Sequence, residues 1–353
     1  MQRKMTLVPL ILLLLPLVMS GVTIEVRAQI VPVNRIAVSV SSLAGIVREV
    51  GGSLSSVDVL LEQETEPHAF TLTPDVLSVA EEADLLVFTG HFHWEEELAN
   101  LTSTPFITFH SPDAWENYEE YGAMYSPMPG GEVEEEEGHD HQGNPHGYWL
   151  LPRNALAIAN ATCRALTTLN SSYVNDWTSN FDRFADSIGE LEDLITSLDE
   201  TYGFSEMRAV VVFPTEAYVA EAFGIATDAV LQVEDITISG AKLVDVQQAI
   251  RNGSINLIIG SDVAKFKTGG EFAYQLQEDY GGILIWWQTV FYAESDYLWM
   301  MNYNLGALVS GIEGVSGNTT DNTVNIGLLA LSAVLGVMIV IESVLLVMRA
   351  RAD

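Results

Sequence analysis

The sequence predicts an α/β protein with two parallel-sheet lobes joined by one long interlobe helix, followed by a C-terminal transmembrane helix. Short apolar runs typical of buried strands alternate with amphipathic helical segments, both before and after one long helical stretch. Such alternation favours parallel sheets covered by helices. A final apolar run is long enough to cross a membrane.

The first lobe is predicted over residues 34–170. Its expected strands are residues 36–40, 57–61, 85–88 and 106–109. Gly51 and Gly52 are expected to end the first helix, and Pro74 to begin the second. Residues 112–144 are rich in Pro, Gly, Tyr and Glu without a period, which predicts a long surface loop.

The two lobes are predicted to be joined by one helix over residues 171–202. Its apolar stripe is Tyr173, Trp177, Phe181, Phe184, Ile188, Leu191, Ile195 and Leu198. This spacing of three and four residues is that of an amphipathic helix, which at 1.5 Å per residue would be roughly 40 Å long. The alternative is a coiled-coil partner face, but the stripe is short for one.

The second lobe is predicted over residues 205–313. Its expected strands are residues 209–213, 230–233, 257–260 and 283–287. Helices are expected between these strands, and a last helix over residues 297–312. The lobe contains no histidine.

The two ends of the chain predict export and membrane anchorage. Residues 1–28 have the basic start, apolar core and Val-Arg-Ala end of a signal peptide. After a linker at 314–325, residues 326–348 form the expected transmembrane helix. Arg349 and Arg351 follow it, so the tail is expected in the cytoplasm and the preceding chain at the cell surface.

Charge and composition narrow the class of partner. The formal net charge of −33 disfavours nucleic acid and anionic lipid and favours cations. All seven histidines lie between Arg48 and Arg153, a window without Lys or Arg. An acidic surface that keeps the protein soluble in salt would explain the charge but not the placing of the histidines. Cys163 stands alone, so there is no internal disulfide and no N-terminal lipoprotein cysteine. Five Asn-x-Ser/Thr triplets predict a glycosylated surface.

An ordered set of motifs resembles a known family. It comprises Glu-Pro-His-Ala-Phe-Thr-Leu-Thr-Pro-Asp at 66–75, Ala-Asp-Leu-Leu-Val at 83–87, Asn-Pro-His-Gly-Tyr-Trp at 144–149, and Tyr297, Met300, Met301 and Asn304. Over roughly residues 34–313 the chain resembles the zinc- and manganese-specific substrate-binding proteins of ABC transporters. The resemblance implies a metal in the cleft between two lobes, typically on three histidines and a carboxylate.

The resemblance assigns two ligands and leaves two positions open. His68 and His146 match the ligands of the first lobe. The third position falls on Phe213, and the fourth falls where Trp286, Trp287 and Gln288 stand. From the residues alone, the candidates for the missing ligands are His91, His93 and Glu216.

A loop at 130–143 looks like the acidic histidine loop of zinc-specific members. Its acidic residues and histidines are Glu134, Glu135, Glu136, Glu137, His139, Asp140 and His141. Their charge is expected to concentrate Zn²⁺ near the cleft, and their imidazoles favour zinc over manganese. A solvated tether without metal is the alternative.

We therefore expect a monomeric binding protein that passes zinc, or alternatively Mn²⁺, to an ABC permease. Rival hypotheses are a degenerate relative whose aromatic cleft binds a non-metal ligand, a metal-buffering or adhesion protein, and a metallohydrolase. An enzyme is disfavoured because no His-Glu-x-x-His, Gly-x-x-x-x-Gly-Lys or Gly-x-Ser-x-Gly motif occurs.

Overall fold

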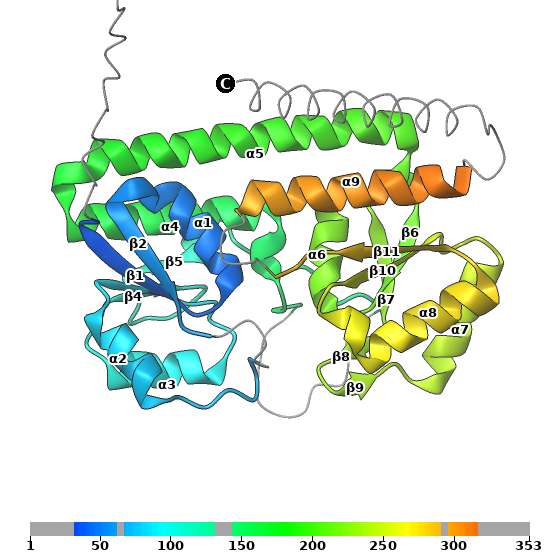
Figure 1. Ribbon diagram of the computed structural model, residues 1–353, viewed down its shortest axis with the longest axis horizontal. Coiled ribbons are helices and arrows are strands. Elements are labelled where there is room, and N and C mark those ends of the chain that lie inside the picture. The colour runs from blue at the N-terminus through cyan, green and yellow to red at the C-terminus, as the bar shows by residue number, and fades with distance from the viewer. Residues whose placement is uncertain (1–31, 62–66, 131–142, 291–295, 317–353) are drawn as a thin grey trace, which may run out of the picture. The chain divides into compact units, whose positions relative to one another are not determined.

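The computed structural model describes residues 32–61, 67–130, 143–290 and 296–316, all of one compact unit. The predicted α/β class with two parallel sheets is confirmed (Figure 1). The expected signal peptide, the charged residues of the acidic loop from Glu134 to His141, and the transmembrane helix at 326–348 lie outside the described residues. Among the described residues, no helix is both long and apolar enough to cross a membrane.

The first lobe contains a five-stranded parallel sheet in the order β2-β1-β3-β4-β5. Its strands are β1 (Asn34–Val38), β2 (Ser55–Val59), β3 (Leu85–Val87), β4 (Phe106–Thr108) and β5 (Glu116–Asn117). Its helices are α1 (Ser41–Gly51), α2 (Pro74–Glu82), α3 (His93–Leu101) and α4 (Pro152–Leu169). Ile36 and Leu86 on the central strands are fully buried, as expected of a parallel sheet covered on both faces.

Part of the predicted surface loop at 112–144 is ordered structure, so that prediction is wrong there. The segment contains β5 and a 3₁₀-helix at Tyr118–Tyr121. Tyr118 is fully buried, and its hydroxyl donates to the carbonyls of Phe88, at 2.8 Å, and Ile107, at 3.2 Å. Asn154 holds the next turn, since its Oδ1 accepts from the amide of Met124 and its Nδ2 donates to the carbonyl of Met124. Such isolated contacts create no period that the sequence could reveal.

The second lobe contains a four-stranded parallel sheet in the order β11-β10-β6-β7. Its strands are β6 (Arg208–Val211), β7 (Ala226–Val230), β10 (Leu257–Ser261) and β11 (Ile283–Trp287), with an antiparallel hairpin of β8 (Gln232–Val233) and β9 (Ile236–Thr237). Its helices are α6 (Pro214–Ala222), α7 (Gly240–Arg251) and α8 (Thr268–Tyr280). The strand predicted at 230–233 is therefore misplaced, because that apolar run covers the end of β7 and the start of the hairpin.

Two helices connect the lobes. Helix α5 (Val174–Tyr202) buries Trp177, Phe184, Ile188, Leu191 and Ile195 of the predicted stripe. Helix α9 (Tyr297–Ser316) lies alongside α5 and packs against both β11 and α1 (Figure 1). One continuous core contains residues of both helices and both sheets. The two lobes are thus packed on a shared core.

Candidate metal site

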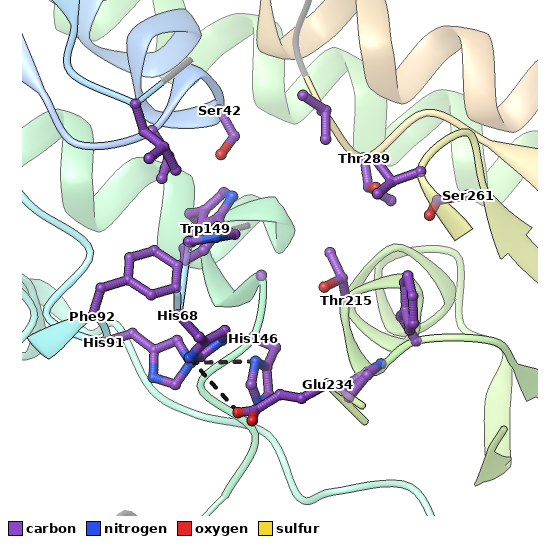
Figure 2. Close-up of a pocket in the computed structure, with 18 of the residues that line it drawn as sticks. Ser42, His68, His91, Phe92, His146, Trp149, Thr215, Glu234, Ser261 and Thr289 are labelled. Carbon is purple, nitrogen blue, oxygen red and sulfur yellow. Dashed lines mark hydrogen bonds and ion pairs between the residues drawn. The ribbon is translucent and has the colours of Figure 1, made fainter. Parts of the chain in front are cut away.

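A pocket of about 330 Å³ is lined by residues of both lobes. Its lining includes Ser42 after β1, His91 after β3, Phe213 after β6 and Thr289 after β11. These segments follow the carboxyl ends of parallel strands, where ligands bind in open α/β sheets. Figure 2 shows the side chains around this cavity.

Three histidines from three separate segments meet on one side of the pocket. His68, His91 and His146 each offer a ring nitrogen within 4.8 Å of the other two. The Nε2 of His91 lies 3.2 Å from the Nδ1 of His146, and the ring centroids of His68 and His91 are 4.9 Å apart (Figure 2). Three converging imidazoles form a donor set suited to a divalent transition metal.

Backbone hydrogen bonds hold the segments that carry these histidines. The amide of His91 donates to Glu95 Oε2 at 3.2 Å, and the amide of His146 donates to Asn144 Oδ1 at 3.0 Å. Asn144 Nδ2 in turn donates to the carbonyl of Pro214, at 2.9 Å, on the second lobe. The His146 segment is therefore tied to α6 as well as to its own lobe.

His146 is in the protonation state that metal binding requires. Burial, and secondarily the neighbouring His68, lowers the pKa of His146 to about 4. Its imidazole is thus neutral at neutral pH and keeps a lone pair for a metal ion. His68 is more accessible, with 30% of its side chain exposed.

The second lobe brings a carboxylate to the triad. Glu234, in the turn between β8 and β9, has its Oε1 3.7 Å from the Nδ1 of His68 (Figure 2). This distance brings the two side chains into contact but is too long for a hydrogen bond. Glu234 has φ +49°, the only positive φ among the described non-glycine residues, so the turn holds it in a rare conformation. Glu234 does not belong to the group whose ligand atoms all lie within 4.8 Å of one another, which consists of the three histidines.

Two of the predicted ligands are not brought to the triad. His93 is the first residue of α3 and is exposed. Glu216 is fully buried near the start of α6, where its Oε2 accepts from the amide of Phe213 at 2.5 Å. Burial is the main cause that raises the pKa of Glu216 to about 8, and the residue does not line the pocket.

The aromatic residues at the expected third and fourth positions are only partly in the pocket. Phe213 lines it as the residue that precedes α6. Trp286 packs on Tyr274, and Trp287 is 1% exposed against Phe223, so neither lines the cavity. The amide of Gln288 donates to Asn304 Oδ1 at 2.7 Å. An aromatic cleft built on both tryptophans, the basis of one rival hypothesis, is not formed.

Sequence reasoning missed Glu234. The chain has 48 acidic residues, so one more glutamate carries no signal by itself. The hairpin has strands of only two residues each, and its first strand merges in the sequence with the preceding apolar run, so no alternating pattern marks it. The approach of this turn to His68 depends on how the lobes pack.

The family profile described as "Zinc-uptake complex component A periplasmic", ZnuA, matches residues 36–311. The zinc-binding lipoprotein AdcA of Streptococcus pneumoniae is 23% identical over 225 residues, 60% of this chain and 42% of the relative. The chain thus spans less than half the length of the curated relatives it matches.

Solved structures share the fold. A crystal structure of ZnuA has 17% identity and a TM-score of 0.62, covering 79% of this chain and 98% of that one. A mutant laminin-binding adhesin (Lmb) of Streptococcus agalactiae has 17% identity and a TM-score of 0.63, covering 79% and 99%. A Mn-bound periplasmic metal-binding protein of Candidatus Liberibacter asiaticus has 17% identity and a TM-score of 0.59, also covering 79% and 99%.

Proposed function

Because the chain belongs to the family of the periplasmic zinc-uptake complex component A, we propose that it captures a divalent metal ion outside the cytoplasm and delivers it to an ABC permease. Zinc is the proposed cargo, with Mn²⁺ as the alternative. The observation that carries the proposal is the convergence of His68, His91 and His146 within 4.8 Å. Binding and release, with no chemical conversion, are the activity we assign.

The donor set supports zinc over manganese. Imidazole nitrogen suits zinc, whereas manganese prefers carboxylate, carbonyl and water oxygen. Three histidines leave the fourth position of a tetrahedral zinc ion open. A neutral His146 can bind without first losing a proton, because its pKa lies well below 7.

Glu234 supplies the second lobe's part in the proposed site. A carboxylate beside the Nδ1 of a histidine orients the ring and increases the basicity of the other nitrogen. Its Oε1 lies 3.7 Å from the Nδ1 of His68, on the side of the ring that this role requires. We assign it this orienting role, and the fourth position of the metal remains open to the cavity.

The proposed location, membrane anchor and acidic loop rest on the sequence. Export by residues 1–28 and anchorage by residues 326–348 would keep a monomeric binding protein at the outer membrane face beside its permease. The acidic loop from Glu134 to His141 would raise the local zinc concentration. The zinc-binding lipoprotein AdcA and the Mn-bound periplasmic protein, whose names state their metals, are consistent with a metal as cargo.

The test is zinc binding by the purified protein, measured by calorimetry and by elemental analysis after dialysis. We expect about one tightly bound zinc ion per chain, and loss of at least about a hundredfold in affinity in His68→Ala with His146→Ala, because two of three protein ligands are removed.

His93→Ala is the matched control, since His93 is exposed and outside the triad. Its zinc affinity should equal that of the wild type. If the wild type bound no zinc, or if the double variant bound zinc as well as the control, the proposed function would be rejected.

A further inference from the structure

The three histidines of the triad lie in segments that are far apart in the sequence. His68 precedes α2, His91 precedes α3 and His146 precedes α4. All three lie outside helices and strands, so regular secondary structure does not by itself fix the distances between their rings. Something else must hold the three segments together, and two buried side chains of the first lobe do so.

Trp94 ties the segment of His68 to α3, the helix that His91 precedes. Its side chain is buried, and the indole Nε1 donates to the carbonyl of Pro67 at 3.1 Å. Its ring also meets the ring of Phe70 in a T-shaped contact, with the centroids 5.1 Å apart. Trp94 therefore holds the chain on both sides of His68.

Phe92 carries this support to the histidine rings. Its ring centroid lies 5.1 Å from that of His68 and 5.0 Å from that of His91 (Figure 2). On its other side Phe92 lies parallel to Trp94, with the centroids 6.3 Å apart. The orientation of two of the three imidazoles thus depends on packing that Trp94 supports.

Tyr148 ties the segment of His146 to the segment of His91. It is fully buried, and its hydroxyl donates to the carbonyl of Thr89 at 2.8 Å. The hydroxyl of Thr89 in turn accepts from the amide of His91 at 3.1 Å. Burial raises the pKa of Tyr148 well above its ordinary value, so the hydroxyl keeps its proton and remains a donor at neutral pH.

We propose that Trp94 and Tyr148 are positioning residues, which assemble the triad within the first lobe before the ion arrives. This inference rests on the proposed function, in which the triad binds zinc. The contacts of Trp94 and Tyr148 all lie within the first lobe, so the second lobe is not needed to bring the three ring nitrogens together. Ligands that are already in place bind more tightly, because less conformational freedom is lost on binding.

The experiment compares Trp94→Phe and Tyr148→Phe with the wild type, all as purified full-length protein. Each substitution keeps an aromatic ring and removes the N–H or O–H that joins two ligand segments. We expect zinc affinity, measured by calorimetry, to fall about tenfold or more in each variant. The visible absorption bands of the cobalt-substituted protein should also shift or weaken, because these bands depend on how the ligands are arranged around the ion.

Tyr297→Phe and Trp177→Phe are the matched controls. Tyr297 is fully buried, and its hydroxyl donates to the carbonyl of Leu150 at 2.6 Å, a contact that joins no two ligand segments. Trp177 is fully buried, and its indole N–H has no hydrogen-bond partner among the described residues. Both controls should keep the zinc affinity and the cobalt spectrum of the wild type, whatever stability they lose.

Circular dichroism verifies that each variant is folded, and the two variants test separate contacts. Wild-type affinity and an unchanged cobalt spectrum in the folded variants would overturn this inference and leave the proposed function standing. Equal losses in the variants and in their controls would also overturn it, because the effect would then be general. Absence of zinc binding by the wild type would instead reject the proposed function, and this inference with it.

Discussion

Glu95 and Glu216 occupy the same local position in the two lobes. Each is the third residue of a helix that follows a sheet strand, and each accepts from the backbone before that helix. Both are almost completely buried, so each carboxyl group depends on hydrogen bonds that replace its hydration. Glu216, an expected ligand, caps a helix and lies outside the histidine triad, so residue type alone does not predict which side chains converge.

Glu216 makes the stability of the protein depend on pH. Its folded pKa of about 8 lies above the ordinary value of 4.5, so the folded state binds more protons than the unfolded state between these values. The stability that this proton uptake adds to the folded state is fully present below pH 4.5 and is lost as pH rises through 8. The loss should be a few kcal/mol at most.

Urea unfolding of the wild type and Glu216→Gln at pH 5 and pH 8 measures this effect. From pH 5 to pH 8, the free energy of unfolding should fall more in the wild type than in the glutamine variant, because the glutamine side chain imitates the protonated acid and does not titrate. Equal losses in the two proteins would show that Glu216 ionises normally.

At the level of single helices, the start of α3 determines which of two nearby histidines lies in the pocket, and the sequence did not distinguish them as candidate ligands. His91 precedes the helix, and its amide is held by Glu95, so its ring joins the triad. His93 begins the helix and is exposed. The side chains of residues just before and just inside a helix point in different directions. Which of the two histidines faces the pocket therefore depends on where the first helical turn begins.

Glu95 should therefore govern zinc affinity without touching the metal. Its Oε1 accepts from the amide of Thr89 at 2.7 Å, and its Oε2 accepts from the amides of Gly90 at 2.8 Å and His91 at 3.2 Å. Glu95→Gln replaces one acceptor oxygen with a donor and leaves backbone amides unpaired. We expect zinc affinity to fall about tenfold to a hundredfold.

Calorimetry on Glu95→Gln and on Glu96→Gln checks this expectation. Glu96 is the next residue of α3 and is exposed, so its variant controls for the loss of one charge. If the two variants bound zinc equally, the positioning role of Glu95 would be refuted.

At the scale of the molecule, the shared core predicts that the lobes unfold together. Trp177 of α5 is fully buried, and its core cluster includes residues of both sheets. Trp177→Ala should lower the free energy of unfolding by about 3–5 kcal/mol, the usual cost of such a truncation. Trp299→Ala is the control, because Trp299 is 47% exposed, and it should cost less than about 1 kcal/mol.

Urea unfolding followed by circular dichroism and by tryptophan fluorescence tests this expectation. The two signals should show one transition at the same urea concentration in each variant. Separate transitions for the two signals would mean that the lobes are independent.

The α/β class, the apolar stripe of α5 and the motif positions of His68 and His146 are predictable from the sequence, because they depend on local period and local residue order. The packing of distant segments determines that His91 and not His93 joins them, and that Glu234 approaches from the second lobe. It also decided that the pocket exceeds the size of an ion. These features arise where segments distant in sequence meet, and the order of strands in a sheet and the packing of two lobes leave no periodic trace in the chain.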